Sequence, residues 1–152
     1  MKKSKKKGII PKSLYIELLE LSKSSKIEEC GIFLGDYEDN KFIIKNIVQD
    51  NENQFGTVNS TVRETNNIYE EYQNKINLEY SIDYIGEWHT HPSGKSNPSH
   101  FDNEAMKFLL NHPKYSYPKE LILGIINSKN GLRVFLYQYD IYKNKEITLK
   151  TI

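Results

Sequence analysis

The stretch GEWHTHPSGKSNPSHFD, residues 86–102, decides how the rest of the chain is interpreted. In a strand, residues i and i+2 point to the same face, so His89 and His91 are expected to stand side by side. Pro92 ends the strand, and the following Gly- and Pro-containing loop can turn the chain back so that the carboxylate of Asp102 faces the imidazoles. Two histidines and one aspartate are three protein ligands for zinc. They would leave the fourth tetrahedral position open, as in catalytic zinc sites.

The same residues have simpler interpretations. A His-x-His pair also occurs without any metal, and Ser99-x-x-Asp102 has the form of a helix capping box. In that role Asp102 would serve only to complement the helix dipole. His100 and His112 are further candidate ligands, which we expect on the surface.

Hydrophobic periodicity and turn residues divide the chain into alternating helices and strands. The predicted elements are a helix over 12–24, strands over 30–35 and 41–48, a polar loop over 50–62, a helix over 63–75, a strand over 84–91, a helix over 100–111, and strands over 121–127 and 132–139. Asn130-Gly131 lies between the last two strands and is typical of a hairpin. The fold class is α/β: a single domain with one mixed sheet flanked by helices.

Composition places this domain in a reducing compartment. The 152 residues are 38% hydrophobic and 27% charged, enough to bury a core without disulfides. Cys30 is the only cysteine, so no intrachain disulfide can form, and the expected location is the cytoplasm. Neither a membrane-spanning stretch nor a signal-peptide apolar region is apparent, so no membrane partner is expected.

The net charge of +1 conceals an uneven distribution. Five lysines stand within residues 1–8, which we expect to be a flexible basic tail, with residues 9–152 forming the domain. Without those five, 16 of the 21 basic residues remain against 20 acidic ones. A lysine run can contact nucleic acid, but a mildly acidic body argues against nucleic-acid binding.

The order of the polar residues resembles a known motif. His89-Thr90-His91, seven residues, Ser99, two residues and Asp102 are similar to the JAMM motif of the MPN+/JAB zinc metalloproteases. That motif also has an upstream glutamate in a Glu-x-small-Gly element that opens an apolar strand.

The segment EECGIFLG, residues 28–35, resembles this upstream element. Alignment on Cys30-Gly31 makes Glu28 the counterpart of the family's catalytic glutamate, with Glu29 as the neighbouring alternative. Residues 86–92 further resemble the bacterial branch of the family.

The resemblance implies a fold, a cofactor and a mechanism. The implied fold is the JAMM/MPN, cytidine-deaminase-like fold, a curved mixed sheet with helices on either side. One Zn²⁺ per chain would be held by His89, His91 and Asp102, and Glu28 would act as general base and then general acid. Ser99 would donate to the developing oxyanion, a use that we expect to dominate over helix capping.

The resemblance also implies a substrate class. Family members typically cleave after the C-terminus of a ubiquitin-like protein, either from lysine or in a precursor. The bacterial branch occurs with E1-like and E2-like partners in mobile-element or anti-phage operons. Two alternatives are a non-catalytic MPN scaffold and a DNA-associated protein like the RadC relatives, which carry a similar His-x-His-Pro-Ser-Gly loop.

Three further residues near the motif have assignable roles. Trp88 is expected in the core, and Cys30 is expected to pack inside its apolar strand rather than act as a nucleophile. Glu87 is either a partner of a metal-binding histidine or an ordinary exposed strand residue.

Overall fold

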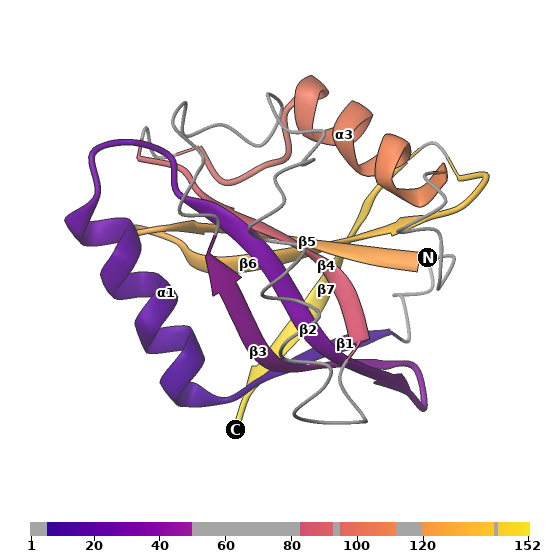
Figure 1. Ribbon diagram of the computed structural model, residues 1–152, viewed down its shortest axis with the longest axis horizontal. Coiled ribbons are helices and arrows are strands. Elements are labelled where there is room, and N and C mark those ends of the chain that lie inside the picture. The colour runs from indigo at the N-terminus through magenta and orange to yellow at the C-terminus, as the bar shows by residue number, and fades with distance from the viewer. Residues whose placement is uncertain (1–5, 50–82, 93–94, 112–119, 142) are drawn as a thin grey trace.

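The computed structural model describes residues 6–49, 83–92, 95–111, 120–141 and 143–152. The elements, labelled as in Figure 1, are β1 (Lys7–Ile10), α1 (Lys12–Ser24), β2 (Cys30–Glu38), β3 (Lys41–Gln49), β4 (Asp83–Thr90), α3 (His100–Asn111), β5 (Glu120–Asn127), β6 (Gly131–Gln138) and β7 (Lys145–Thr151). The helices and strands predicted within the described residues are confirmed, with small shifts at their ends. The loop predicted over 50–62 and the helix predicted over 63–75 lie outside the described residues.

The strands close into a barrel in the order β1-β3-β2-β4-β5-β6-β7. Closure depends on β1, which is parallel to β3 on one side and to β7 on the other. β4 and β5 are also parallel and the remaining neighbours are antiparallel, so the predicted mixed α/β arrangement is confirmed. The expected curved sheet is in fact closed. Neither β1 nor β7 is predicted from the sequence, because β1 has four residues next to the lysine run and β7 buries only Ile147.

β1 also places the start of the folded domain earlier than charge alone predicts. Lys7 and Gly8 pair with residues of both β3 and β7, so they belong to the barrel and not to the tail expected over residues 1–8. Lys6 forms an ion pair with Glu120 at the start of β5. Strand pairing uses the backbone, which leaves lysine side chains free to point outward at no cost to the ladder.

The two described helices cover different sides of the strands (Figure 1). α1 begins after Pro11 and buries Leu18 against a cluster that contains Phe33 and Trp88. α3 packs against a second cluster through its own buried apolar residues, Met106, Leu109 and Leu110. Within the described part of the chain, neither helix combines the length and apolarity that crossing a membrane requires.

β4 lies between β2 and β5, and its side chains point alternately to the two sides of the barrel wall. Trp88 is fully buried in the α1-side cluster, as predicted, and donates its Nε1–H to the Ile32 carbonyl at 3.2 Å. Gly31 stands opposite Trp88, and a Cβ there would lie 2.6 Å from the indole ring. His89 points the other way and pairs with Cys30, which packs against Ala105 of α3. The predicted burial of Cys30 is therefore confirmed.

The β5–β6 hairpin forms where Asn130-Gly131 predicts it. Gly131 has a φ of 68°, in the left-handed region that favours glycine. The side-chain oxygen of Asn127 accepts the N–H groups of Lys129 and Asn130, which closes the turn. This turn brings β6 back alongside β5.

Candidate functional site

His89 and His91 lie at the C-terminal end of β4. His89 is completely buried, because β4 pairs it with Cys30 on one side and with Ile125 on the other. His91 follows the strand, but its N–H still donates to the Ile126 carbonyl at 2.9 Å. The two ring centroids are 4.5 Å apart, with the ring planes inclined by 52°. The imidazoles therefore stand side by side, as strand alternation predicts.

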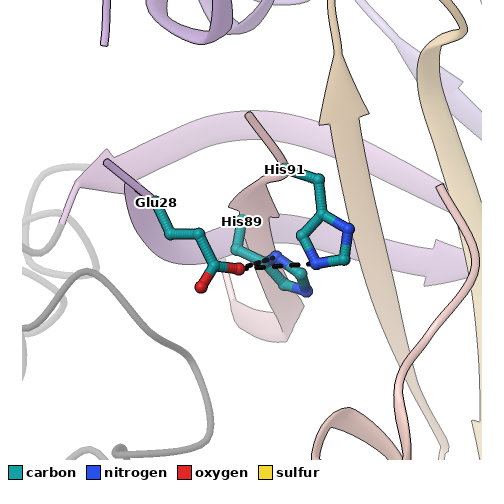
Figure 2. A group of neighbouring side chains, drawn as sticks. All are labelled: Glu28, His89 and His91. Atoms are coloured by element: carbon teal, nitrogen blue, oxygen red, sulfur yellow. Dashed lines mark ion pairs between the residues drawn. The ribbon is translucent and has the colours of Figure 1, made fainter. Parts of the chain in front are cut away.

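Glu28 reaches both imidazoles from the segment that leads into β2 (Figure 2). Its Oε1 lies 3.4 Å from Nδ1 of His89 and 3.4 Å from Nε2 of His91. One ligand atom from each of the three residues lies within 4.8 Å of the other two. Two imidazole nitrogens and a carboxylate oxygen at this spacing can hold a metal ion.

The neighbouring Glu29 is engaged elsewhere. Its Oε1 accepts the Ser25 hydroxyl and its Oε2 accepts the Gln49 side chain, each at 3.0 Å. Its backbone exchanges two hydrogen bonds with Thr90, from N–H to the threonine Oγ1 and from the threonine N–H to the Glu29 carbonyl, both 2.8 Å. Thr90, the middle residue of His-x-His, thus holds the glutamate segment against β4 with Glu28 turned toward the histidines.

Asp102 approaches His89 from the start of α3. Its Oδ2 accepts the Ser99 N–H at 2.8 Å, and its own N–H donates to the Ser99 Oγ at 3.1 Å, so the predicted capping box forms. The cap directs the other carboxylate oxygen, Oδ1, to within 3.2 Å of Nε2 of His89. Asp102 is 4% exposed, whereas Ser99 lies at the surface.

The capping box does not by itself prevent Ser99 from donating a hydrogen bond, and the expectation that a catalytic use dominates over capping stays a prediction. In the capping box the Ser99 Oγ accepts a hydrogen bond, which occupies a lone pair. The hydroxyl proton is not used in that contact and can still be donated. One side chain can therefore start the helix and donate to a ligand at the same time.

The site attracts positive charge. Burial alone would lower the pKa of His89, but the carboxylates of Asp102 and Glu28 outweigh it and raise that pKa to about 9. Burial would raise the pKa of Asp102, yet contact with His89 and with the Ser99 N–H holds it below its ordinary value. A proton and a metal ion compete for the same imidazole nitrogens, so a site that favours one also favours the other.

Two details of the imidazoles fit a metal. Nε2 of His89 is buried without a hydrogen-bond partner among the described residues, because the Asp102 carboxylate lies near it but is not aligned for a hydrogen bond. Coordination would satisfy such an atom. Nδ1 of His91 lies 2.6 Å from the Lys95 carbonyl. Since a carbonyl only accepts, this Nδ1 carries a proton, and Nε2 is the nitrogen of His91 that remains for a metal ion.

The predicted ligand set and the observed grouping differ in their carboxylate. Glu28 lies against both imidazoles, whereas Asp102 lies against Nε2 of His89, on the opposite side of that ring from Nδ1. The two nitrogens of one imidazole point apart, so a single ion cannot bind both. The roles of Asp102 as ligand and Glu28 as base stay predictions.

Other residues singled out from the sequence have clear places. Glu87 is 1% exposed and accepts the Tyr84 hydroxyl at 2.6 Å, so the interpretation as an exposed strand residue is wrong. His100 is exposed at the first position of α3, as expected. His112 lies outside the described residues.

Comparison with known proteins gives the class of this chain. Residues 11–136 match the family described as prokaryotic homologs of the JAB domain, and the chain belongs to this family. A similar solved structure is the solution structure of protein DSY2949 from Desulfitobacterium hafniense, with a TM-score of 0.66 and 16% sequence identity. The match covers 95% of this chain and 92% of that one, a likeness of fold. No curated protein sequence gave a significant match.

Proposed function

We propose that this JAB-domain protein is a zinc-dependent peptidase or isopeptidase that cleaves after the C-terminus of a bacterial ubiquitin-like protein. The observation that carries the proposal is the position of the Glu28 carboxylate, 3.4 Å from both His89 and His91. A carboxylate beside two imidazoles places a proton carrier next to a metal-binding pair, and metal-dependent peptide hydrolysis uses both groups.

In this proposal His89, His91 and Asp102 hold the zinc ion. When bound, zinc would supply a Lewis acid that lowers the pKa of a water molecule to about 7 and polarises a carbonyl group. His89 and Asp102 form the buried side of the site, which keeps their geometry fixed. The capping box adds to this rigidity, because it ties the Asp102 carboxylate to the first turn of α3.

Glu28 would move the proton. Its side chain is 27% exposed, so it can meet both water and substrate while its Oε1 stays at the imidazoles. It would take a proton from the attacking water and return it to the departing amine, as general base and then general acid. The hydrogen bonds of the neighbouring Glu29 hold the segment in place for this role.

Ser99 would stabilise the negative charge that develops on the carbonyl oxygen. Its Oγ is fixed by the Asp102 N–H, and its proton remains available for the oxyanion. Ser99 and the partly exposed His91 lie on the accessible side of the site, where an extended chain can enter.

The substrate class in this proposal comes from the family and the sequence motif. The JAB family includes metalloproteases and also non-catalytic members. The substrate would be a ubiquitin-like protein or its conjugate, and E1-like and E2-like enzymes would be the accompanying partners. A bond at such a C-terminus is flexible and exposed, which suits a site with one open side.

A matched pair of variants tests the assignment. Glu28→Gln and Glu29→Gln change adjacent glutamates in the same way. Each zinc-loaded variant is incubated with a bacterial ubiquitin-like precursor, and cleavage of the precursor is followed by mass spectrometry. We expect Glu28→Gln to lose about 10²–10⁴-fold in turnover, as removal of a general acid–base does, and Glu29→Gln to lose far less. Full activity in Glu28→Gln would remove the proposed role, and no cleavage by wild type would favour the scaffold members of the family.

A further inference from the structure

Arg133 of β6 contacts the loop that connects β4 to α3. Its Nη1 donates to the Ser96 Oγ and the Asn97 Oδ1, both at 3.0 Å, and lies 3.5 Å from the Ser96 carbonyl. Asn130, in the β5–β6 turn, donates to the same Ser96 Oγ at 3.2 Å. More than 30 residues of chain separate these partners, so the contacts tie the loop to a distant strand.

The other side of the same guanidinium is held by β7. Arg133 Nε and Nη2 donate to the two carboxylate oxygens of Glu146 at 2.9 and 2.6 Å. Its guanidinium carbon also lies 5.2 Å from the centre of the Phe135 ring. A planar guanidinium can bond in two directions at once, so Glu146 fixes the orientation in which Nη1 meets the loop.

The loop in turn contacts the candidate metal site. Lys95, next to Ser96, provides the carbonyl that accepts Nδ1–H of His91 at 2.6 Å. Ser99, two residues past Asn97, begins α3 and caps Asp102. A displacement of this loop would therefore break the hydrogen bond that fixes the proton of His91 on Nδ1. It would also shift the Asp102 carboxylate, which faces His89.

β6 fixes the start of α3 at a second point on the same face. Tyr137, four residues beyond Arg133, donates to the Asn103 Oδ1 at 2.5 Å, and Asn144 donates to that oxygen at 3.0 Å. Asn103 directly follows Asp102. Residues 133 and 137 lie on one face of the strand, so the same strand supports both ends of the segment 96–103.

We propose that Arg133 is a positioning residue of the metal site: held by Glu146, it fixes residues 96 and 97 and so keeps the Lys95 carbonyl against His91. This inference rests on the proposed metal-dependent function. Arg133 itself contacts no proposed ligand, so its effect is transmitted through the loop. Partners of metal-binding histidines commonly change metal affinity 10- to 100-fold when they are lost.

The test measures zinc affinity by competition with a chromogenic chelator on the purified full chain. We expect Arg133→Gln to weaken zinc binding about tenfold, at the low end of that range because the arginine acts through the Lys95 carbonyl. The visible absorption of the Co²⁺-substituted protein should change in the same variant, since it reports the arrangement of ligands. Arg133→Lys should not restore either property, because one ammonium cannot bond Glu146 and Ser96 together in the guanidinium geometry.

Lys45→Gln is the matched control. Lys45 of β3 forms an ion pair with Asp36 of β2 at 2.6 Å, and this pair is about as exposed as Arg133 and Glu146. Asp36 lies about 20 Å along β2 from Cys30, at a rise of about 3.3 Å per residue. Lys45→Gln should keep the zinc affinity and the Co²⁺ spectrum of wild type. Ser96→Ala added to Arg133→Gln should weaken binding little further, because both act through one contact.

The outcomes separate this inference from the proposed function. Wild type that binds zinc, with unchanged affinity and Co²⁺ spectrum in Arg133→Gln, would overturn the positioning role alone. Full recovery in Arg133→Lys would contradict the two-sided contact. Wild type that binds neither ion would overturn the metal-dependent function, and the positioning role with it.

Discussion

The two sides of the barrel wall are built from the same strands but bury different kinds of side chain. The side covered by α1 buries an apolar cluster that includes Trp88. The side covered by α3 buries His89, Asp102 and Glu87 among its apolar residues. Along β4, Trp88 and His89 are neighbours that point to opposite sides. Both sides therefore bury an apolar cluster, and the α3 side adds these three ionisable groups, each of which has a partner.

The largest expected effect on stability is on the α1 side. Trp88→Ala should lower the free energy of unfolding by about 3–5 kcal/mol, because it removes the largest fully buried side chain and leaves a cavity. Urea titration followed by circular dichroism measures this loss. Trp88→Phe should have a stability between those of wild type and Trp88→Ala. A loss below about 1 kcal/mol in Trp88→Ala would mean that packing of the indole on the α1 side contributes little to stability.

On the α3 side, two substitutions of Ser99 should differ in their effect on stability but not in their effect on turnover. Ser99→Ala should cost about 1 kcal/mol of stability through loss of the cap, while Ser99→Gly should cost only a few tenths. Both lack the hydroxyl, so both should lose about 10²–10³-fold in turnover. Unfolding curves and cleavage rates of the two variants, measured side by side, test this. Turnover that follows stability instead would show that the hydroxyl acts only as a cap.

The smallest effect is expected at the outer edge of the α3 side. The hydrogen bonds from Arg133 lower the pKa of Glu146 despite its partial burial, so the pair stabilises the fold above the ordinary glutamate pKa of about 4.3. This contribution is lost as pH falls through the lowered value. Because solvent still reaches both side chains, Glu146→Gln should cost at most about 1 kcal/mol at pH 7.

The measurement is the difference in unfolding free energy between wild type and Glu146→Gln as a function of pH. It should shrink toward zero in acid and also decrease in high salt. A difference of several kcal/mol that persists in acid would give the α3 side a stabilising role comparable to that of Trp88.

Much of the fold could be predicted because its elements have clear periods. The helices over 12–24 and 100–111 repeat apolar residues at helical spacing, and the central strands are rich in Ile, Leu and Phe. β1 and β7 lack such a signal, since their place depends on pairing with each other across the whole length of the chain. Barrel closure therefore could not be predicted from local patterns.

The candidate site was predictable as a set of residues but not as a geometry. The spacing from His89 to Asp102 indicates which side chains could meet. Which of Glu28 and Glu29 faces the histidines depends on the pairing of Cys30 with His89 and on the contacts of Glu29. The sequence shows neither. The Lys95 carbonyl is a backbone group and leaves no sequence signature at all.

The most direct test of the proposed metal site is the zinc content per chain after equilibration with zinc and gel filtration, measured by mass spectrometry. We expect one zinc in wild type, in Glu28→Gln and in the surface control His100→Ala. We expect that zinc to be lost in His91→Ala and Asp102→Asn. Zinc retained by Asp102→Asn but lost from Glu28→Gln would contradict the proposed site, because Glu28 would then be the third ligand and not the proton carrier.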